Sequence, residues 1–169
     1  MVYIVRMRVT IKHLYISPDH HYYGTEEKVA ADHVMIERTS IDLKAGEGIE
    51  NDYFLGSEEA HKGQITFFDW EVFKTVRDEI VKGDLRPSNF QRNIFIEGVD
   101  LHTLIGKRFQ LGGIEFLGAC ETSPSPWMGE ECADGVHDSL KNRAGIISSI
   151  LKDGRLDCGI YELEVLGDA

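Results

Sequence analysis

The stretch that decides the fold of this chain is Arg92–Trp127, which reads RNIFIEGVDLHTLIGKRFQLGGIEFLGACETSPSPW. Its β-branched start predicts a strand over residues 93–97, which Gly98 ends. Apolar residues then recur at helical spacing over a single turn, residues 101–105, and Gly106 closes that turn. The first half of the stretch therefore predicts a strand followed by a short helical turn.

The second half of the stretch predicts a β-hairpin over residues 107–120. Gly112-Gly113 is a strong tight-turn signal between two apolar runs. The second strand of this hairpin is predicted to end at Cys120. The polar segment 121–128 that follows contains two prolines, which cannot continue a strand ladder, so it is predicted to form an exposed lip.

The rest of the chain adds strands and one long helix. Residues 5–12 alternate apolar and polar side chains, which is the period of a half-buried strand. Asp69 is the predicted N-cap of an amphipathic helix over 69–82, which Lys82-Gly83 ends. A shorter helix is predicted over 138–142, and residues 41–52 are interpreted as irregular. All strands together are predicted near residues 3–16, 33–38, 64–68, 93–97, 107–120 and 160–166.

Composition limits the class of protein. A length of 169 residues without repeats or linkers predicts one domain, residues 1–169. The net charge of −11 argues against nucleic acid or an anionic membrane as partner. No apolar run approaches the roughly 18 residues of a membrane span, and the N-terminus has no secretory pattern. Three irregularly spaced cysteines fit a reducing compartment, so we expect a cytoplasmic protein.

Many short strands, frequent glycine turns and one substantial helix predict an all-β or β-rich barrel. Four segments in order resemble one family, the MOSC domain, which is named for the C-terminal domain of molybdenum-cofactor sulfurases. The resemblance covers roughly residues 13–166 and implies a closed, twisted β-barrel with a few peripheral helices. The matching segments are Gly48–Asp52, Gln64–Glu71, the stretch from Arg92 to the Ser-Pro-Ser-Pro-Trp-Met loop at residues 123–128, and Arg143–Ile146 with Lys152–Leu156.

The family resemblance also implies a sulfur-carrying cysteine in the loop after the hairpin. The family's cysteine follows a proline just before an aromatic-Met pair, and here Ser125 stands in that slot. A serine hydroxyl cannot form a persulfide. Cys120, five residues upstream, is then the candidate for a reactive thiolate, and its alternative is a small hydrophobe at the end of a strand. Cys132 and Cys158 are interpreted as structural.

A second group of candidates binds a cofactor. Arg92, Arg143 and Arg86 fall in or near the matching segments, and an arginine side chain suits bidentate capture of a phosphate or an oxoanion. The alternative is that each pairs with a surface carboxylate. Asn93 lies beside Arg92 in the same motif. Asp52 either caps its own turn or orients a pocket arginine.

No protein-ligated metal site is predicted. His20-His21, Cys132 and His137 lack the paired spacing that zinc sites use. A phosphate-binding glycine loop and a nucleophile elbow are also missing from the sequence.

The resemblance implies a protein that binds the molybdenum cofactor, molybdopterin, or carries sulfur for its sulfuration. The sulfur would come from a separate cysteine desulfurase, which would hold the pyridoxal phosphate, and a molybdoenzyme is the other implied partner. One alternative is a non-catalytic anion- or pterin-binding module that has lost the sulfur-transfer cysteine. Another is a molybdenum-dependent reductase of N-oxygenated compounds, in which Cys120 would ligate the metal.

Overall fold

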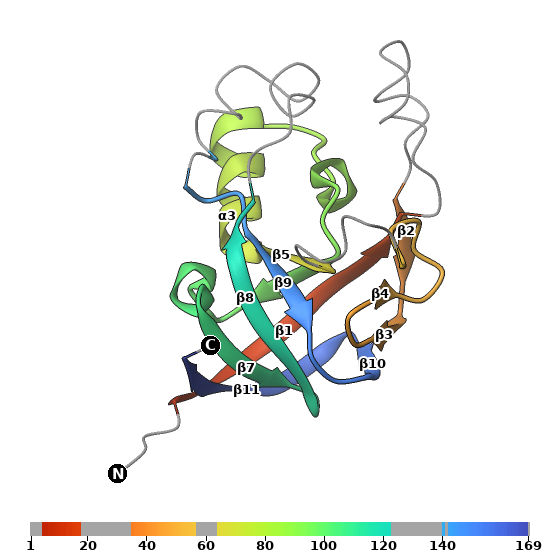
Figure 1. The fold of residues 1–169 in the computed structure, drawn as a ribbon. Helices are drawn as coiled ribbons and strands as arrows, with labels where there is room; N and C mark the ends of the chain where they lie inside the picture. Colours follow the sequence, from red (N-terminus) through yellow and green to blue (C-terminus); the bar gives the residue numbers. More distant parts are fainter. Residues whose placement is uncertain (1–4, 18–34, 57–63, 123–139, 141, 169) are drawn as a thin grey trace.

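Seven strands close into a twisted β-barrel in the computed structural model of the chain, which describes residues 5–17, 35–56, 64–122, 140 and 142–168 (Figure 1). The strand order is β11-β7-β8-β9-β5-β6-β1, and β1 closes the barrel by pairing with β11 from Val5↔Val165 to Ile11↔Gly159. Neighbouring strands are antiparallel except β5 and β6. The predicted fold class is confirmed. The barrel strands are β1 (Val5–Ile16), β5 (Ile65–Asp69), β6 (Ile94–Glu97), β7 (Lys107–Leu111), β8 (Ile114–Glu121), β9 (Ile146–Ile150) and β11 (Gly159–Asp168).

The deciding stretch folds as its local signals predict. Gly112 and Gly113 have φ of 58° and 79°, the two positive values that a tight I′ hairpin turn requires. They join β7 to β8 in the register Leu111↔Ile114. The preceding helical turn is the 3₁₀ helix η4 (Leu101–Leu104), which Asp100 caps. Its two leucines are buried, so η4 packs against the inside of the barrel.

A second, three-stranded sheet was not predicted. It has the order β10-β3-β4, with β3 (Ser40–Lys44), β4 (Gly48–Ile49) and β10 (Gly154–Asp157). The interpretation of residues 41–52 as irregular is therefore wrong. These strands have two to five residues, and Ile41 pairs with Leu156 far along the chain, so local periodicity is too short to reveal them. The same holds for β9. The strand predicted near residues 33–38 is present as β2 (Ile36–Arg38), which pairs with β1.

The predicted long helix starts where expected but changes its geometry. Asp69 accepts a hydrogen bond from the Glu71 backbone N–H and caps α3 (Trp70–Thr75). From there the chain continues as a π-helical segment, η2 (Val76–Val81), instead of as α-helix. Lys82, not a glycine, adopts the left-handed cap with φ of 54°. The 3₁₀ helix η3 (Pro87–Phe90) follows, and the short helix predicted over 138–142 lies mostly outside the described residues.

Two hydrophobic clusters hold these elements together. The larger one fills the barrel and includes Ile41 and Leu156, so the small sheet shares the barrel core. Three stacked or edge-on phenylalanines, Phe67, Phe109 and Phe116, lie at its centre. The smaller cluster packs α3 and η3 against outward-facing aromatic side chains of the barrel strands. No helix among the described residues is long and apolar enough to cross a membrane.

Candidate functional site

A pocket of about 340 Å³ lies where three segments meet beside the barrel. The start of α3, the helical turn η4 and the segment that enters β9 each contribute one wall. The described part of its lining consists of Asp69, Val72, Asp100, Leu101, His102, Asn142, Arg143 and Gly145.

Two of the pocket carboxylates are helix caps. The Asp69 carboxylate accepts the Glu71 N–H at 2.8 Å, and the Asp100 carboxylate accepts the His102 N–H at 3.2 Å. Each cap orients its side chain through the backbone of its own helix. Burial raises the pKa of Asp69, and the negative charges of Glu71 and Asp100 add to that effect. This wall of the pocket therefore carries two carboxyl groups, each held by a cap hydrogen bond.

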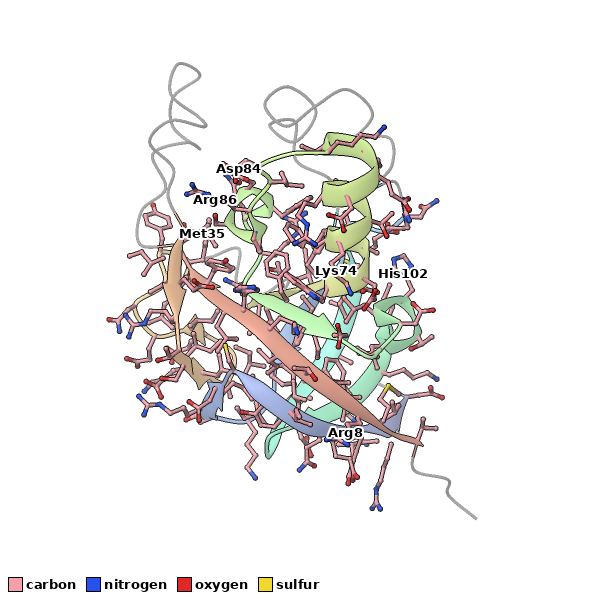
Figure 2. All side chains as sticks on the ribbon, turned by 180° about the vertical axis from the view of Figure 1, so that it is seen from behind. Arg8, Met35, Lys74, Asp84, Arg86 and His102 are labelled. Atoms are coloured by element: carbon pink, nitrogen blue, oxygen red, sulfur yellow. The ribbon has the colours of Figure 1, made fainter. Side chains whose placement is uncertain are left out.

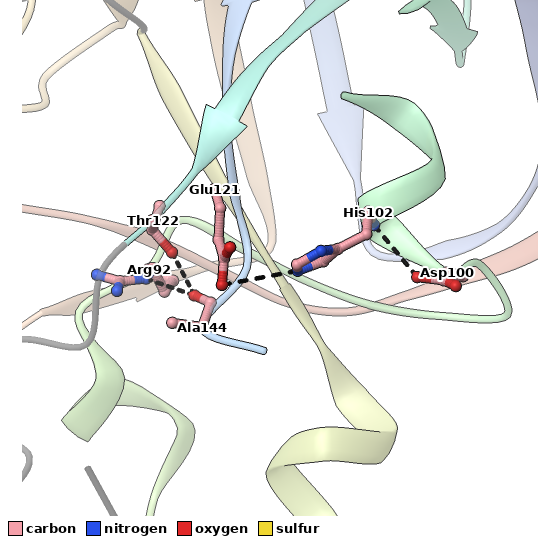
Figure 3. Close-up of polar contacts among 6 residues, drawn as sticks. All are labelled: Arg92, Asp100, His102, Glu121, Thr122 and Ala144. Atoms are coloured by element: carbon pink, nitrogen blue, oxygen red, sulfur yellow. Dashed lines mark hydrogen bonds and ion pairs between the residues drawn. The ribbon is translucent and has the colours of Figure 1, made fainter. Parts of the chain in front are cut away.

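A histidine and a glutamate stand side by side next to this wall (Figure 3). His102 Nε2 lies 3.9 Å from Glu121 Oε1, and Glu121 is the last residue of β8. This Nε2 is buried and makes no hydrogen bond to any described residue. At 3.9 Å the pair attracts electrostatically once the histidine is protonated, but the separation is too long for a hydrogen bond. The imidazole therefore keeps a donor or acceptor position for a ligand.

Arg92 and Thr122 bond to the backbone of residues 144–145, which leads into β9 beside the pocket. Its Nε donates to the Ala144 carbonyl at 3.3 Å, and the Thr122 hydroxyl donates to the same oxygen. The Thr122 N–H bonds to the Gly145 carbonyl at 2.9 Å. Arg92 is only 9% exposed, so its buried side chain has a structural role: it bonds to the backbone that leads into β9. The chain leaves the described part at Thr122 and re-enters it at Leu140.

Arg143 is the predicted arginine that lines the pocket. It is exposed, and its backbone N–H bonds to the Leu140 carbonyl at 2.8 Å in the turn that leads into β9. Arg92 comes close to it through Ala144, the next residue. Arg86, by contrast, is exposed at the start of η3, beside Asp84, and Figure 2 places it well away from His102. Of the three predicted arginines, the described pocket lining therefore contains Arg143, while Arg92 bonds to the backbone of the next residue, Ala144.

Asn93 and Asp52 make structural hydrogen bonds. The Asn93 amide oxygen accepts the Thr66 N–H and hydroxyl, both at 3.0 Å, and its Nδ2 donates to the Tyr15 carbonyl at 3.1 Å. Asn93 thus links β1, β5 and the start of β6. The Asp52 carboxylate accepts the backbone N–H of Ser17 at 2.6 Å and of Phe54 at 3.0 Å, as a turn cap does. Burial raises the pKa of Asp52.

Cys120 lies in β8 and is exposed. The register shifts between Gly118 and Cys120, so Cys120 pairs with Ile147, the residue after the core residue Ile146. Its side chain therefore points to the outer face of the barrel, and it does not line the described pocket. Cys158, the other described cysteine, is also exposed. Ser125 and Cys132 lie outside the described residues.

The chemistry of the pocket is mixed. The described lining contains two carboxylates, one arginine and one histidine, whereas the site residues predicted from the sequence to capture a phosphate or an oxoanion were arginines. Within the described part of the chain, no three His, Cys, Asp or Glu side chains lie close enough to hold a metal ion. Asp100, His102 and Glu121 were not predicted as site residues, and Asp69 was predicted only as a cap. The available signal was a pair of N-cap aspartates, each at the start of a helix.

The fold has solved relatives. The YuaD protein from Bacillus subtilis superimposes with a TM-score of 0.73 at 17% identity, over 96% of this chain and 99% of that one. YiiM from Escherichia coli superimposes with a TM-score of 0.61 at 14% identity, over 98% of this chain and 71% of that one. YiiM from Geobacillus stearothermophilus superimposes with a TM-score of 0.64 at 10% identity, over 94% of this chain and 75% of that one. No protein-family model matches the chain, and no curated protein matches its sequence. The comparisons support a MOSC-like fold.

Proposed function

We propose that this chain is a MOSC-like domain that binds a ligand of the molybdopterin type in the pocket between α3, η4 and the start of β9. The observation that carries the proposal is the pocket itself, whose described lining combines Arg143 with hydrogen-bonding side chains. Its volume of about 340 Å³ is within the range of small-molecule sites. The MOSC-like fold agrees with this function.

The residues present fit such a ligand. Arg143 supplies the planar, permanently charged group that suits a phosphate. The buried Nε2 of His102, which lacks a hydrogen-bond partner among the described residues, supplies a further polar position. Arg92 fixes the backbone behind Arg143 and so holds that wall in place. The molybdenum cofactor, when bound, would supply the metal and the dithiolene of its molybdopterin, while the chain would bind and orient it.

Binding is tested by mixing the protein anaerobically with molybdopterin released from a molybdoenzyme. Gel filtration then separates the complex, and the bound pterin is oxidised to its fluorescent form and measured. Wild type should retain pterin, and Arg143→Ala should retain about tenfold less, because a charge-assisted hydrogen bond contributes about 1.5–3 kcal/mol. Arg155→Ala is the matched control, since Arg155 pairs with Asp42 on the small sheet. Equal retention by both variants would refute the proposal.

Sulfur carriage by Cys120 is a second candidate function, favoured by the exposure of this thiol. The Cys120 thiolate would attack the outer sulfur of a persulfide on a separate cysteine desulfurase. A new S–S bond then forms on Cys120 as the donor S–S bond breaks, and the donor cysteine leaves as a thiolate. The pyridoxal phosphate of this route belongs to the desulfurase. A molybdoenzyme would be the partner that receives the product.

Intact-mass measurement after incubation with a desulfurase and cysteine tests the sulfur step. A gain of about 32 Da, one sulfur atom, should appear in wild type and in Cys158→Ser and be absent in Cys120→Ser. A gain seen only in Ser125→Cys identifies a binding module without a sulfur-transfer cysteine. Metal analysis and visible absorbance test the remaining alternative, a molybdenum-dependent reductase of N-oxygenated compounds.

A further inference from the structure

The outer face of the seam between β1 and β11 carries two neighbouring rows of opposite charge. Val9 and Leu163 point into the barrel core, so the residues next to them along each strand point outward. The outward side chains are basic on β1 and acidic on β11 over most of this length. The register places them opposite each other as Arg6 and Glu164, Arg8 and Glu162, and Thr10 and Ile160. Figure 2 looks onto this face, which no described helix covers, and labels Arg8 on it.

Two side chains on this face have features that a covering partner would satisfy. Arg6 pairs with both glutamates of its own chain, at 3.1 Å from Glu164 and 3.5 Å from Glu162. Arg8 is exposed, and it forms no ion pair with any residue that the structure describes. Ile160 is 60% exposed, the highest value among the large apolar side chains of the described chain. The face therefore suits a partner that brings a carboxylate to Arg8 and covers Ile160.

The charge pattern of this face is complementary to itself. The whole chain has a net charge of −11, so two copies repel each other over most of their surface. On this face the two arginines and the two glutamates cancel. A two-fold axis that runs along the seam, parallel to the strands, would lay β1 of each copy over β11 of the other. Arg8 of each copy would then face Glu162 of the other copy, and Arg6 would face Glu164.

We propose that the outer face of the β1–β11 seam is the interface of a two-fold symmetric dimer of this chain. Ile160 of each copy packs against Thr10 of the other, and the arginine and glutamate rows meet on both sides of the axis. Because two barrels present convex surfaces, contact is limited to the strands nearest the axis, and long charged side chains span the remaining gap. The interface is therefore small and its stability depends on salt. No described residue that lines the pocket belongs to β1 or β11, so this inference is independent of the proposed function.

Charge reversal tests the pairing directly. Sedimentation velocity over micromolar concentrations in low salt measures the equilibrium between monomer and dimer. Arg8→Glu and Glu162→Arg each place like charges opposite each other at both copies of this contact. Each variant alone should therefore dimerise at least about tenfold more weakly than wild type. Arg155→Glu is the matched control, because it changes the net charge as much as Arg8→Glu does but lies in β10 of the small sheet.

An equimolar mixture of the two variants should dimerise as well as wild type. In the mixed dimer, residue 8 of each copy again faces the opposite charge at residue 162 of the other copy. Contacts within one chain cannot produce this recovery, so it reports on the interface alone. Glu162 and Arg8 are both exposed, and circular dichroism of each variant checks that the fold is kept.

Wild type should dimerise in low salt and dissociate in high salt. Charges are screened over about 10 Å at 0.1 M salt and over about 3 Å at 1 M. Ile160→Ser should weaken the dimer at both salt concentrations, since it removes apolar contact and no charge. Wild type that stays monomeric at every concentration would overturn the inference. A dimer that both charge reversals leave intact, or a mixture that stays monomeric, would overturn it as well.

Discussion

Arg92→Ala should destabilise the whole domain, because the buried Arg92 side chain hydrogen-bonds to the backbone beside the pocket. The guanidinium donates to the Ala144 carbonyl at 3.3 Å, and Ala144 is fully buried. Losing a hydrogen bond from a charged group costs about 1.5–3 kcal/mol, and losing the packed aliphatic stem adds to this. Relief of the cost of burying the charge offsets part of the loss. The free energy of unfolding should therefore fall by about 2–4 kcal/mol.

Urea denaturation measures this change. With a slope of about 2 kcal/mol per molar urea, the midpoint should fall by roughly 1–2 M. Arg155→Ala is the control, since Arg155 and Asp42 form an exposed ion pair worth about 0–1 kcal/mol. Thr122→Val adds a second test, because Thr122 and Arg92 donate to the same carbonyl. The double variant leaves that buried oxygen without either donor, so its loss should exceed the sum of the single losses by about 1 kcal/mol or more.

The account of Arg92 is refuted if Arg92→Ala unfolds at the same urea concentration as wild type. If Arg92→Ala loses ligand binding while its free energy of unfolding is unchanged, Arg92 contacts the ligand and does not stabilise the backbone beside the pocket. Additive losses in the double variant would show that Arg92 and Thr122 do not act on a common acceptor. The comparison therefore separates the structural role from the cofactor-binding role that the sequence predicted.

Three further predictions concern single residues. The pKa of Asp69 is raised in the folded state, so the folded protein holds this proton more tightly than the unfolded chain does. The stability of wild type relative to Asp69→Asn should therefore be highest below a pH of about 4 and should fall as the pH rises through the raised pKa. Thermal unfolding of both proteins across pH measures this difference. Gly145→Ala should unfold at much lower temperature than Gly113→Ala, since a Cβ at Gly145 would lie 2.1 Å from the Phe67 carbonyl and one at Gly113 meets nothing within 4 Å. Cys158 should be alkylated at neutral pH more slowly than an unstructured cysteine peptide. Although its side chain is exposed, partial desolvation by its surroundings raises the pKa of the thiol, and the negative charges of Glu37 and Asp157 add to this effect. Equal rates in peptide mapping would contradict this.

Local signals predicted the hairpin and the main helix start, because their causes lie within a few residues of chain. The Gly112-Gly113 turn and the Asp69 cap are of this kind. The small sheet depends on pairing between Ile41 and Leu156, which no window of sequence contains. The π-helical continuation of α3 likewise carries no local signal that we recognise.

The candidate site likewise combines residues that local sequence signals predicted with residues that only the tertiary structure brings together. Arg143 was predicted from its motif, and the structure places it in the pocket lining. The carboxylate wall was missed because Asp69 and Asp100 meet only after β6 pairs with β5. Cys120 was predicted as a candidate reactive thiolate, and a shift of register turns it to the outer face. That shift coincides with the close approach of Gly118 to the Leu104 carbonyl, a tertiary contact that the sequence does not reveal.

The most direct test of the central claim is to map the bound ligand by NMR. Backbone amide shifts of the labelled protein are recorded as pterin-6-carboxylate is added. The account predicts that the largest changes fall on residues 69–72, 100–102 and 142–145, which line the pocket, and that the small sheet at residues 40–49 is unaffected. Changes concentrated on the small sheet, or no saturable change at the pocket residues, would contradict it.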